Sequence, residues 1–99
     1  MDSRVIFHRL VQRDMDGILR YYREEAAISV ADRFFETFLH VIDSALTSPK
    51  RFHPITSALR RANIPGFPYH FLYRETNFGI RILVLRHDRR HPDYGMRRQ

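Results

Sequence analysis

The chain has 99 residues and a formal net charge of +6, from 17 Lys and Arg against 11 Asp and Glu. A chain of this length predicts one domain, residues 1–99, with a single modest core. It contains no cysteine, which excludes disulfide bonds, thiolate metal sites and a cysteine nucleophile. No apolar run approaches the roughly 20 residues of a membrane-spanning helix, so we expect a soluble, cytoplasmic protein without a membrane partner.

Arginine supplies nearly all of the positive charge, because Lys50 is the only lysine. Guanidinium groups bind phosphates and carboxylates through paired hydrogen bonds. A small basic domain of this kind predicts an anionic partner, either a nucleic acid or an acidic surface. The alternative is that the positive charge only keeps the domain soluble.

The first expected elements are a strand and an amphipathic helix. Residues 4–9, with the sequence RVIFHR, alternate weakly between apolar and polar side chains, which predicts a strand. Apolar residues then recur with the period of a helix, and Asp14 and Asp16 suit the positive end of its dipole. The apolar stripe consists of Val11, Met15, Ile18, Leu19 and Tyr22.

A second helix is expected after the segment EEAAIS. Ser29 and Asp32 resemble a shortened capping box, which predicts the helix start at Ser29, and Pro49 predicts its end. Two amphipathic helices joined this tightly predict an antiparallel hairpin. The second stripe is the strongest in the chain and consists of Ala31, Phe34, Phe35, Phe38, Leu39, Ile42, Ala45 and Leu46.

The last third of the chain is expected to be mostly strand. Residues 50–66 lose the helical period and are rich in Pro and Gly, which predicts a loop with room for a short strand at residues 59–64. Alternating apolar residues in 67–73 and 78–84, with the turn ETN between them, predict an antiparallel β-hairpin. The predicted fold is therefore α+β: an N-terminal strand, an antiparallel helical hairpin, and a C-terminal antiparallel sheet of two or three strands.

The final strand and the segment after it carry the candidate binding site. Alternate residues from 78 to 84 make one apolar face, so Arg81 and His87 are expected on the face away from the helices. With the arginines that follow, they predict a positive patch for phosphates or an acidic partner, although a solvated charge at the strand end is an equally good interpretation of Arg81 alone. Tyr94 offers a ring that can stack on a base or a hydroxyl that can donate a hydrogen bond. A structural role, in which its ring covers the edge of the core, is equally compatible with the sequence. The predicted binding residues are Arg81, Arg86, Arg89, Arg90, Tyr94 and Arg97.

Other candidate sites have less support. His87 and His91 stand four residues apart, but that zinc spacing needs a helix and a third ligand, so no metal site is predicted. His53 and His70 are candidates for acid–base chemistry near neutral pH, but a structural or surface role is the simpler interpretation of each. No cofactor is expected, because the sequence has no glycine-rich phosphate loop, nucleophile elbow or paired catalytic carboxylates.

Two long segments carry a resemblance to a known family. They read RDMDGILRYYREEAAISVADRFFETFLHVIDSALTSP and FPYHFLYRETNFGIRILVLRHDRRHPDY. The likeness lies at Asp14, Ile18, Tyr22, Ala31, Phe34, Phe38, Leu46, Pro49, Pro68, Tyr69, Tyr73, Ile82, His87, Arg90, Pro92 and Tyr94. In this order the residues resemble the RelE/ParE superfamily of toxins from bacterial type II toxin–antitoxin modules, over nearly the whole chain. No single motif is specific, so the resemblance rests on the ordered set.

The resemblance implies a toxin of a plasmid-stabilisation system that is neutralised by an antitoxin encoded beside it, so a toxin–antitoxin hetero-oligomer is expected. ParE-like members of the superfamily inhibit DNA gyrase by binding, without known catalytic residues. RelE-like members are endoribonucleases that cut messenger RNA on the ribosome. For the ribonuclease alternative, His87 is the candidate base or acid, and Arg81, Arg90 and Tyr94 complete the catalytic set.

Departures from the ribonuclease pattern favour the ParE-like branch. The segment PYHFLY has His70 where several ribonuclease members carry an arginine. No Asp or Glu stands between Asp43 and Glu75 to supply the glutamate that others use, and Lys50 is alone where others have several lysines. A third alternative is a basic domain that binds nucleic acid or a protein partner without toxicity.

Overall fold

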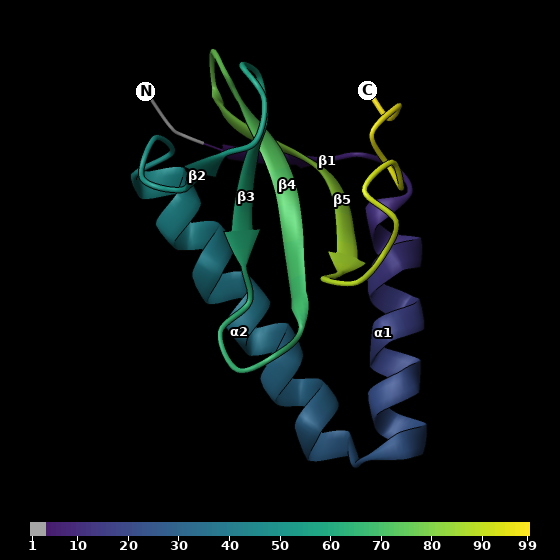
Figure 1. The fold of residues 1–99 in the computed structure, drawn as a ribbon. Helices are drawn as coiled ribbons and strands as arrows, with labels where there is room; N and C mark the ends of the chain where they lie inside the picture. Colours follow the sequence, from purple (N-terminus) through teal and green to yellow (C-terminus); the bar gives the residue numbers. More distant parts are fainter. Residues whose placement is uncertain (1–3) are drawn as a thin grey trace.

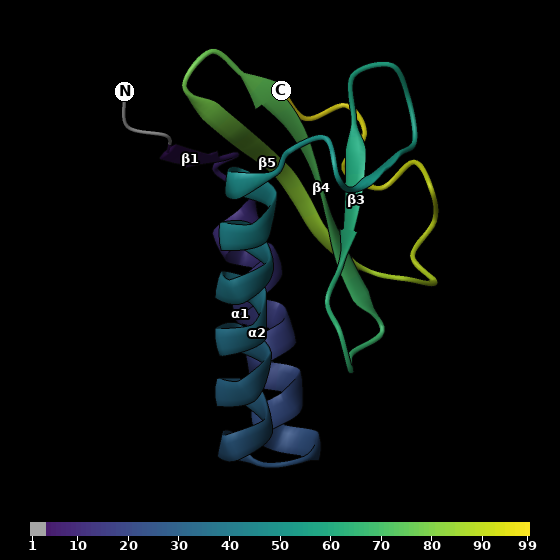
Figure 2. The same ribbon diagram turned by 90° about the vertical axis from the view of Figure 1, so that its left-hand side faces the viewer.

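Two helices lie against one face of a sheet in a two-layer arrangement (Figure 1, Figure 2). The computed structural model describes residues 4–99. The predicted α+β class, N-terminal strand and helical hairpin are confirmed. The elements are β1 (Arg4–Phe7), α1 (Val11–Glu25), α2 (Ile28–Thr47), β2 (His53–Pro54), β3 (Arg60–Asn63), β4 (Tyr69–Thr76) and β5 (Gly79–His87).

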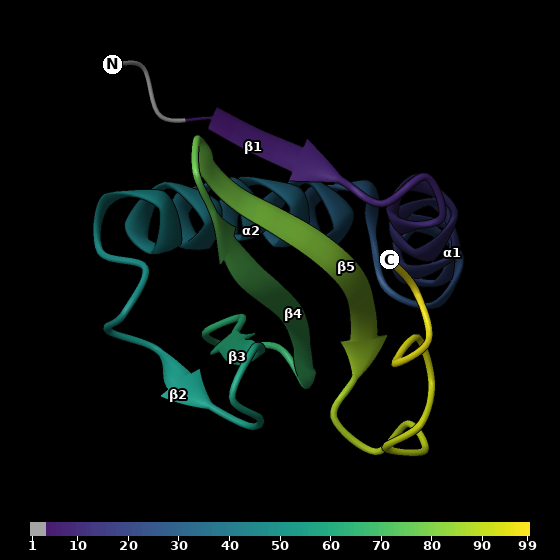
Figure 3. The same ribbon diagram turned by 90° about the horizontal axis from the view of Figure 1, so that it is seen from above.

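The sheet is larger than the predicted antiparallel sheet of two or three strands, and it is mixed. It has five strands in the order β1-β5-β4-β3-β2, and β1 lies parallel to β5 while the other pairs are antiparallel (Figure 3). The prediction missed β1 as a member because its partner is more than 70 residues away, with Arg4 opposite Gly79. It missed β2 because two residues show no alternation. A β-carbon on Gly79 would lie 2.0 Å from the Arg4 carbonyl oxygen, so this pairing needs glycine.

The first helix follows its predicted stripe. The second helix departs from its predicted stripe at Phe35 and Leu39, which are 42% and 47% exposed, and it also departs from its predicted start. Val11, Met15 and Ile18 of α1 are buried, as the period indicated. Helix α2 begins at Ile28 rather than at Ser29, and its N-cap Ala27 supplies no side-chain hydrogen bond. The capping box was therefore wrong, because the tight connection at residues 26–27 leaves Ser29 inside the first turn. Within residues 4–99, no helix has the length and apolar character needed to cross a bilayer.

The core between the layers combines aliphatic side chains with a cluster of aromatic rings. Phe34 of α2 is fully buried and contacts the rings of Phe67 and Tyr69 edge-on, at centroid distances of 5.1 and 5.3 Å. Phe38, one turn later, contacts Phe71 at 5.6 Å in the same geometry. Such edge-to-face pairs add to the free energy gained by burial. The core therefore fixes α2 across β4.

A β-bulge in β5 switches the faces of the last strand. Val84 pairs with Leu72 and Ile82 pairs with Tyr73, so Leu83 is an extra residue with no partner opposite. Beyond the bulge, residues 84 and 86 face away from the helices. His87 faces the helices, where its ring lies 5.0 Å from that of Tyr69.

This bulge corrects two expectations. Strict alternation put Val84 on the helix face and His87 on the open face, and the structure places each on the opposite side. Arg81, which precedes the bulge, lies on the open face as expected. One extra residue inverts every later side chain, because the side-chain period of a strand is two.

We expect Phe38→Ala to lower the free energy of unfolding by about 3–5 kcal/mol, because it leaves a cavity against Phe71. Phe35→Ala is the matched control, since Phe35 is on the same helix but 42% exposed, and we expect a loss of less than about 1 kcal/mol. Equilibrium urea unfolding followed by circular dichroism measures both. Equal losses would contradict the assigned faces of α2.

Candidate functional site

We call residues 88–99 the tail. After β5 the tail turns back over the open face of the sheet toward α1 (Figure 1, Figure 3). Arg86 holds it there by donating from Nη1 to the carbonyl oxygens of Pro92 and Tyr94, each at 2.8 Å. Gly95 has a φ of +80° and packs so closely on Val84 that a β-carbon would lie 2.5 Å from the Val84 Cγ2. The tail is therefore a packed part of the domain.

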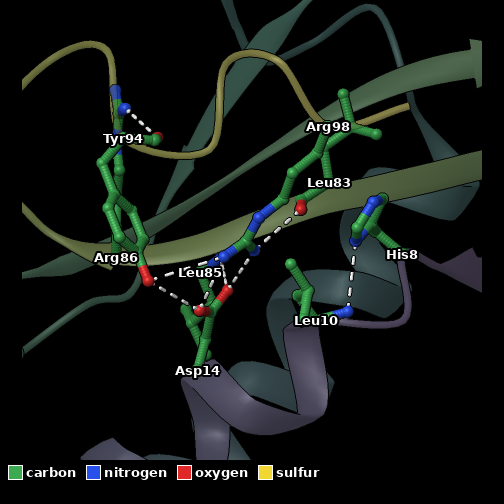
Figure 4. Close-up of polar contacts among 8 residues, drawn as sticks. All are labelled: His8, Leu10, Asp14, Leu83, Leu85, Arg86, Tyr94 and Arg98. Atoms are coloured by element: carbon green, nitrogen blue, oxygen red, sulfur yellow. Dashed lines mark hydrogen bonds and ion pairs between the residues drawn. The ribbon is translucent and has the colours of Figure 1, made fainter.

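The strongest attachment of the tail is an ion pair between Arg98 and Asp14 of α1, which we call the clasp (Figure 4). The Arg98 guanidinium donates to both carboxylate oxygens, with distances of 2.6 Å from Nη1 to Oδ2 and 3.1 Å from Nη2 to Oδ1. Both side chains are largely buried, at 3% exposure for Asp14 and 11% for Arg98. The hydrogen bond to Asp14 raises the pKa of Arg98, so this guanidinium stays charged.

The clasp also completes the hydrogen bonding of β5. Strand β1 makes its last bond to β5 at the Ile82 carbonyl, which accepts from His8 at 2.8 Å. Beyond this point the Leu85 amide donates to Asp14 Oδ2 at 3.1 Å, and the Leu83 carbonyl accepts from Arg98 Nη1 at 3.1 Å. The two charged side chains thus replace a neighbouring strand along the second half of β5.

A second polar cluster surrounds His70 on the open face of the sheet. The imidazole is 1% exposed, and its Nε2 accepts a hydrogen bond of 2.9 Å from Arg86 Nε. The proton therefore sits on Nδ1, which donates to Asp88 Oδ1 at 2.8 Å. Burial lowers the pKa of His70 and keeps it neutral, and the hydrogen bond to Asp88 opposes this shift only in part. Because both ring nitrogens are occupied, His70 is not available for the acid–base chemistry considered for it.

The predicted site residues fall into separate groups. Arg86 is buried, and its guanidinium donates to His70 and to the carbonyl oxygens of Pro92 and Tyr94. Arg81 donates from Nε and Nη2 to the Gln99 carbonyl oxygen, at 2.9 and 2.6 Å. The Arg90 guanidinium lies 4.0 Å above the centroid of the Tyr94 ring, and the Tyr94 hydroxyl lies 3.4 Å from Asp14 Oδ1. The exposed members are Arg89, Arg90 and Arg97.

An open pocket of about 330 Å³ lies between α1, the end of β5 and the tail, and we call it the tail pocket. It brings together the predicted residues Arg90, Tyr94 and His87 with two residues that the sequence analysis missed, Arg13 and Tyr21 of α1. Their spacing in the sequence could have indicated this arrangement, because residues 13, 17 and 21 are four positions apart and therefore share one face of a helix. Gly17 lies between them and also lines the pocket.

Comparison with solved structures shows the class of fold. The chain is similar to one described as "Chromosomal ParDE TA system from P. aeruginosa", with a TM-score of 0.74 and 16% identity. The match covers 88% of this chain and 96% of the solved one. This small α+β fold is thus the fold of a protein from a toxin–antitoxin system.

Comparison of sequences shows the family. The family model described as "ParE toxin of type II toxin-antitoxin system, parDE" matches residues 5–92, so the chain belongs to the ParE toxin family. It is also 28% identical over 94 residues to Toxin ParE2 from two strains of Mycobacterium tuberculosis, a match that covers 94% of this chain and 89% of the relative. The predicted membership of the RelE/ParE superfamily, on its ParE-like branch, is confirmed. This membership implies an antitoxin partner and a toxin–antitoxin hetero-complex.

We expect Asp14→Asn to lower the free energy of unfolding by roughly 3 kcal/mol, because it leaves the buried Arg98 without a counter-ion. The tail should also become accessible to trypsin, since its attachment to α1 is lost. Asp93→Asn is the control, because that carboxylate is 90% exposed and 3.8 Å from His91, and we expect little change in either measurement. Unchanged proteolysis of the tail in Asp14→Asn would show that the clasp does not hold it.

We expect stability to fall as the pH drops below about 6.5, the ordinary pKa of histidine. His70 has a lowered pKa in the folded state, so it takes up a proton on unfolding and stabilises the fold fully only above its unfolded pKa. The loss should continue toward the lowered folded pKa, with a slope of at most about 1.4 kcal/mol per pH unit. Urea unfolding at a series of pH values measures it, and His70→Gln should flatten the curve while the exposed His91→Gln should not. If His91→Gln flattened the curve and His70→Gln did not, the proton taken up on unfolding would belong to a group other than His70.

Proposed function

We propose that this toxin inhibits DNA gyrase by binding it, in the cytoplasm, and that its role is plasmid stabilisation together with its antitoxin. The family establishes a toxin of a type II system. The gyrase target is supported by the likeness to the ParE branch and by the separation of Arg81 from the other residues of the ribonuclease alternative.

The separation of His87 from Arg81 is the observation that carries this proposal. Cleavage of RNA through the ribose 2′-hydroxyl needs a base and a cationic group within reach of one phosphate. His87 faces the helices at the end of β5, whereas Arg81 lies on the open face and binds the Gln99 carbonyl. They stand six residues apart, on the order of 20 Å along a strand. Arg81 is therefore absent from the pocket that His87, Arg90 and Tyr94 line, so the four residues of the ribonuclease alternative do not form one site. The loss of one cation from the set favours binding over cleavage of RNA.

The arginines that project from the tail suit a binding role. Arg89, Arg90 and Arg97 are exposed, and no hydrogen bond or ion pair of their guanidinium groups occurs among residues 4–99. A guanidinium without an internal hydrogen bond or ion pair gives up no polar contact of the protein when it binds a carboxylate or a phosphate. We place the contact with the target on this part of the tail.

The antitoxin has a different surface available to it. An apolar groove of about 590 Å³ runs between α1, α2 and the end of β1. Phe7, Phe35 and Leu39 line it and are 45%, 42% and 47% exposed. Such exposure is costly in water and suits an amphipathic segment laid into the groove. We propose that the antitoxin covers this groove.

We expect the purified toxin to inhibit DNA supercoiling by gyrase in vitro and to leave messenger RNA intact in a ribosome-containing translation extract. Arg89, Arg90 and Arg97 replaced together by Ala should weaken inhibition of gyrase. The matched control replaces Arg20 and Arg23, exposed residues of α1, and should retain it. Induced expression should cause DNA breaks and filamentation. Ribosome-phased cuts in transcripts with unaffected supercoiling would instead establish the ribonuclease alternative.

A further inference from the structure

The tail pocket contains cationic groups that the fold does not use. Among residues 4–99, the guanidinium groups of Arg13 and Arg90 make no hydrogen bond or ion pair, although that of Arg90 covers the Tyr94 ring. The His87 Nδ1 accepts from the Arg89 amide at 3.0 Å, so in the neutral ring the proton lies on Nε2. Three donors from α1, the end of β5 and the tail therefore line one pocket.

The electrostatics of the pocket favour an anion. Asp14 is the only carboxylate among the lining residues, and the clasp neutralises it with Arg98. Arg86, whose chain also lines the pocket, is a buried cation whose hydrogen-bond acceptors are all neutral: His70 Nε2 and two carbonyl oxygens. The Asp88 carboxylate reaches Arg86 only through His70, so the charge of Arg86 has no direct ion pair, and a bound anion nearby gains free energy.

The rest of the lining is aromatic and apolar. Tyr21 is 55% exposed, and its edge-on contact with Tyr22, at a centroid distance of 5.5 Å, orients the ring. Tyr69 and Leu85 are buried and contribute to the wall. An exposed ring beside guanidinium groups is the combination that binds an unpaired base and its phosphate.

We infer that the tail pocket binds a single nucleotide, with its phosphate between Arg13 and Arg90 and its base on Tyr21. The volume of about 330 Å³ is at the lower end of small-molecule sites, which suits one nucleotide and exceeds what one carboxylate side chain fills. The nucleotide can be free or can be the phosphorylated end of a strand, since both present the same groups. The inference does not depend on gyrase being the target.

The test is direct binding to the purified toxin without gyrase. Titration with 5′-AMP, followed by calorimetry and by amide chemical shifts, should give saturable binding with shifts at Gly17, Tyr21 and Leu85. Adenosine should bind about tenfold or more weakly, because it lacks the charge-assisted hydrogen bonds of the phosphate. Arg13→Ala should weaken 5′-AMP binding by a similar factor, and Arg20→Ala on the same helix should not.

A larger side chain at Gly17 can block the tail pocket without removing a charge. A β-carbon at Gly17 meets no atom within 4 Å, so Gly17→Ala should fold and bind normally, whereas Gly17→Leu should fold and lose binding because its side chain occupies the pocket. Circular dichroism and urea unfolding check the fold of both. Unchanged binding in folded Gly17→Leu, or equal weakening by Arg13→Ala and Arg20→Ala, would overturn the inference.

Further probes separate the sources of the ligand. A short single strand with a 5′-phosphate that binds more tightly than 5′-AMP and than its unphosphorylated form indicates a strand end. Equal affinity of 5′-AMP and the phosphorylated strand indicates a free nucleotide. Inorganic phosphate that binds as tightly as 5′-AMP would exclude the role of Tyr21. Binding of an acidic peptide but not of 5′-AMP would assign the pocket to a protein partner and overturn the inference.

Discussion

The ion pair between Asp14 and Arg98 is the contact on which the tail and the second half of β5 both depend. Strand β1 stops pairing at Ile82, so the edge of β5 beyond it would otherwise present unsatisfied peptide groups. Asp14 accepts the Leu85 amide, Arg98 donates to the Leu83 carbonyl, and each neutralises the charge of the other. Breaking the pair would leave both a buried charge and an open strand edge. The clasp therefore joins three segments, α1, β5 and the tail, in one contact.

The bulge at Leu83 determines which residues can act together. Without the extra residue, Arg81 and His87 would share a face and the open side of the sheet would carry one continuous basic patch. With it, Arg86 turns to the open face and reaches His70 and the tail carbonyls, while His87 turns toward α1 and the tail pocket. The same inversion places Val84 where Gly95 can pack on it. A shift of one residue thus divides the predicted basic patch between the interior and two separate surfaces.

Local periodicity was enough to predict the helices, most of their buried faces and the hairpin of β4 and β5, because these patterns depend on neighbours a few residues apart. It also assigned Phe35 and Leu39 to the stripe of α2, but the structure leaves both exposed. It could not predict that β1 pairs with β5, that two residues form β2, or that Leu83 bulges, because each depends on a distant partner. The candidate site likewise contains residues that the sequence predicted and residues that only the folded chain reveals. Of the predicted set of Arg81, His87, Arg90 and Tyr94, the last three line one pocket, and Arg81 lies elsewhere. Arg13, Tyr21 and the role of Asp14 were missed, since Asp14 and Arg98 are 84 residues apart and only the folded chain brings them together.

The net charge of +6 overstates the positive surface that is free to bind. Arg86 and Arg98 are used inside the domain, and Arg61 pairs with Asp88 at 3.2 Å. The arginines left at the tail pocket come from α1 and from the tail, so a ligand that bridges them can bind only while the tail is docked. Linkage then requires that such a ligand stabilise the docked tail. It also requires that a partner which displaces the tail lower the affinity for the ligand by the same factor as the ligand lowers the affinity for that partner. An antitoxin that pulled the tail away from α1 would in this way separate Arg90 from Arg13 and remove the site for the ligand.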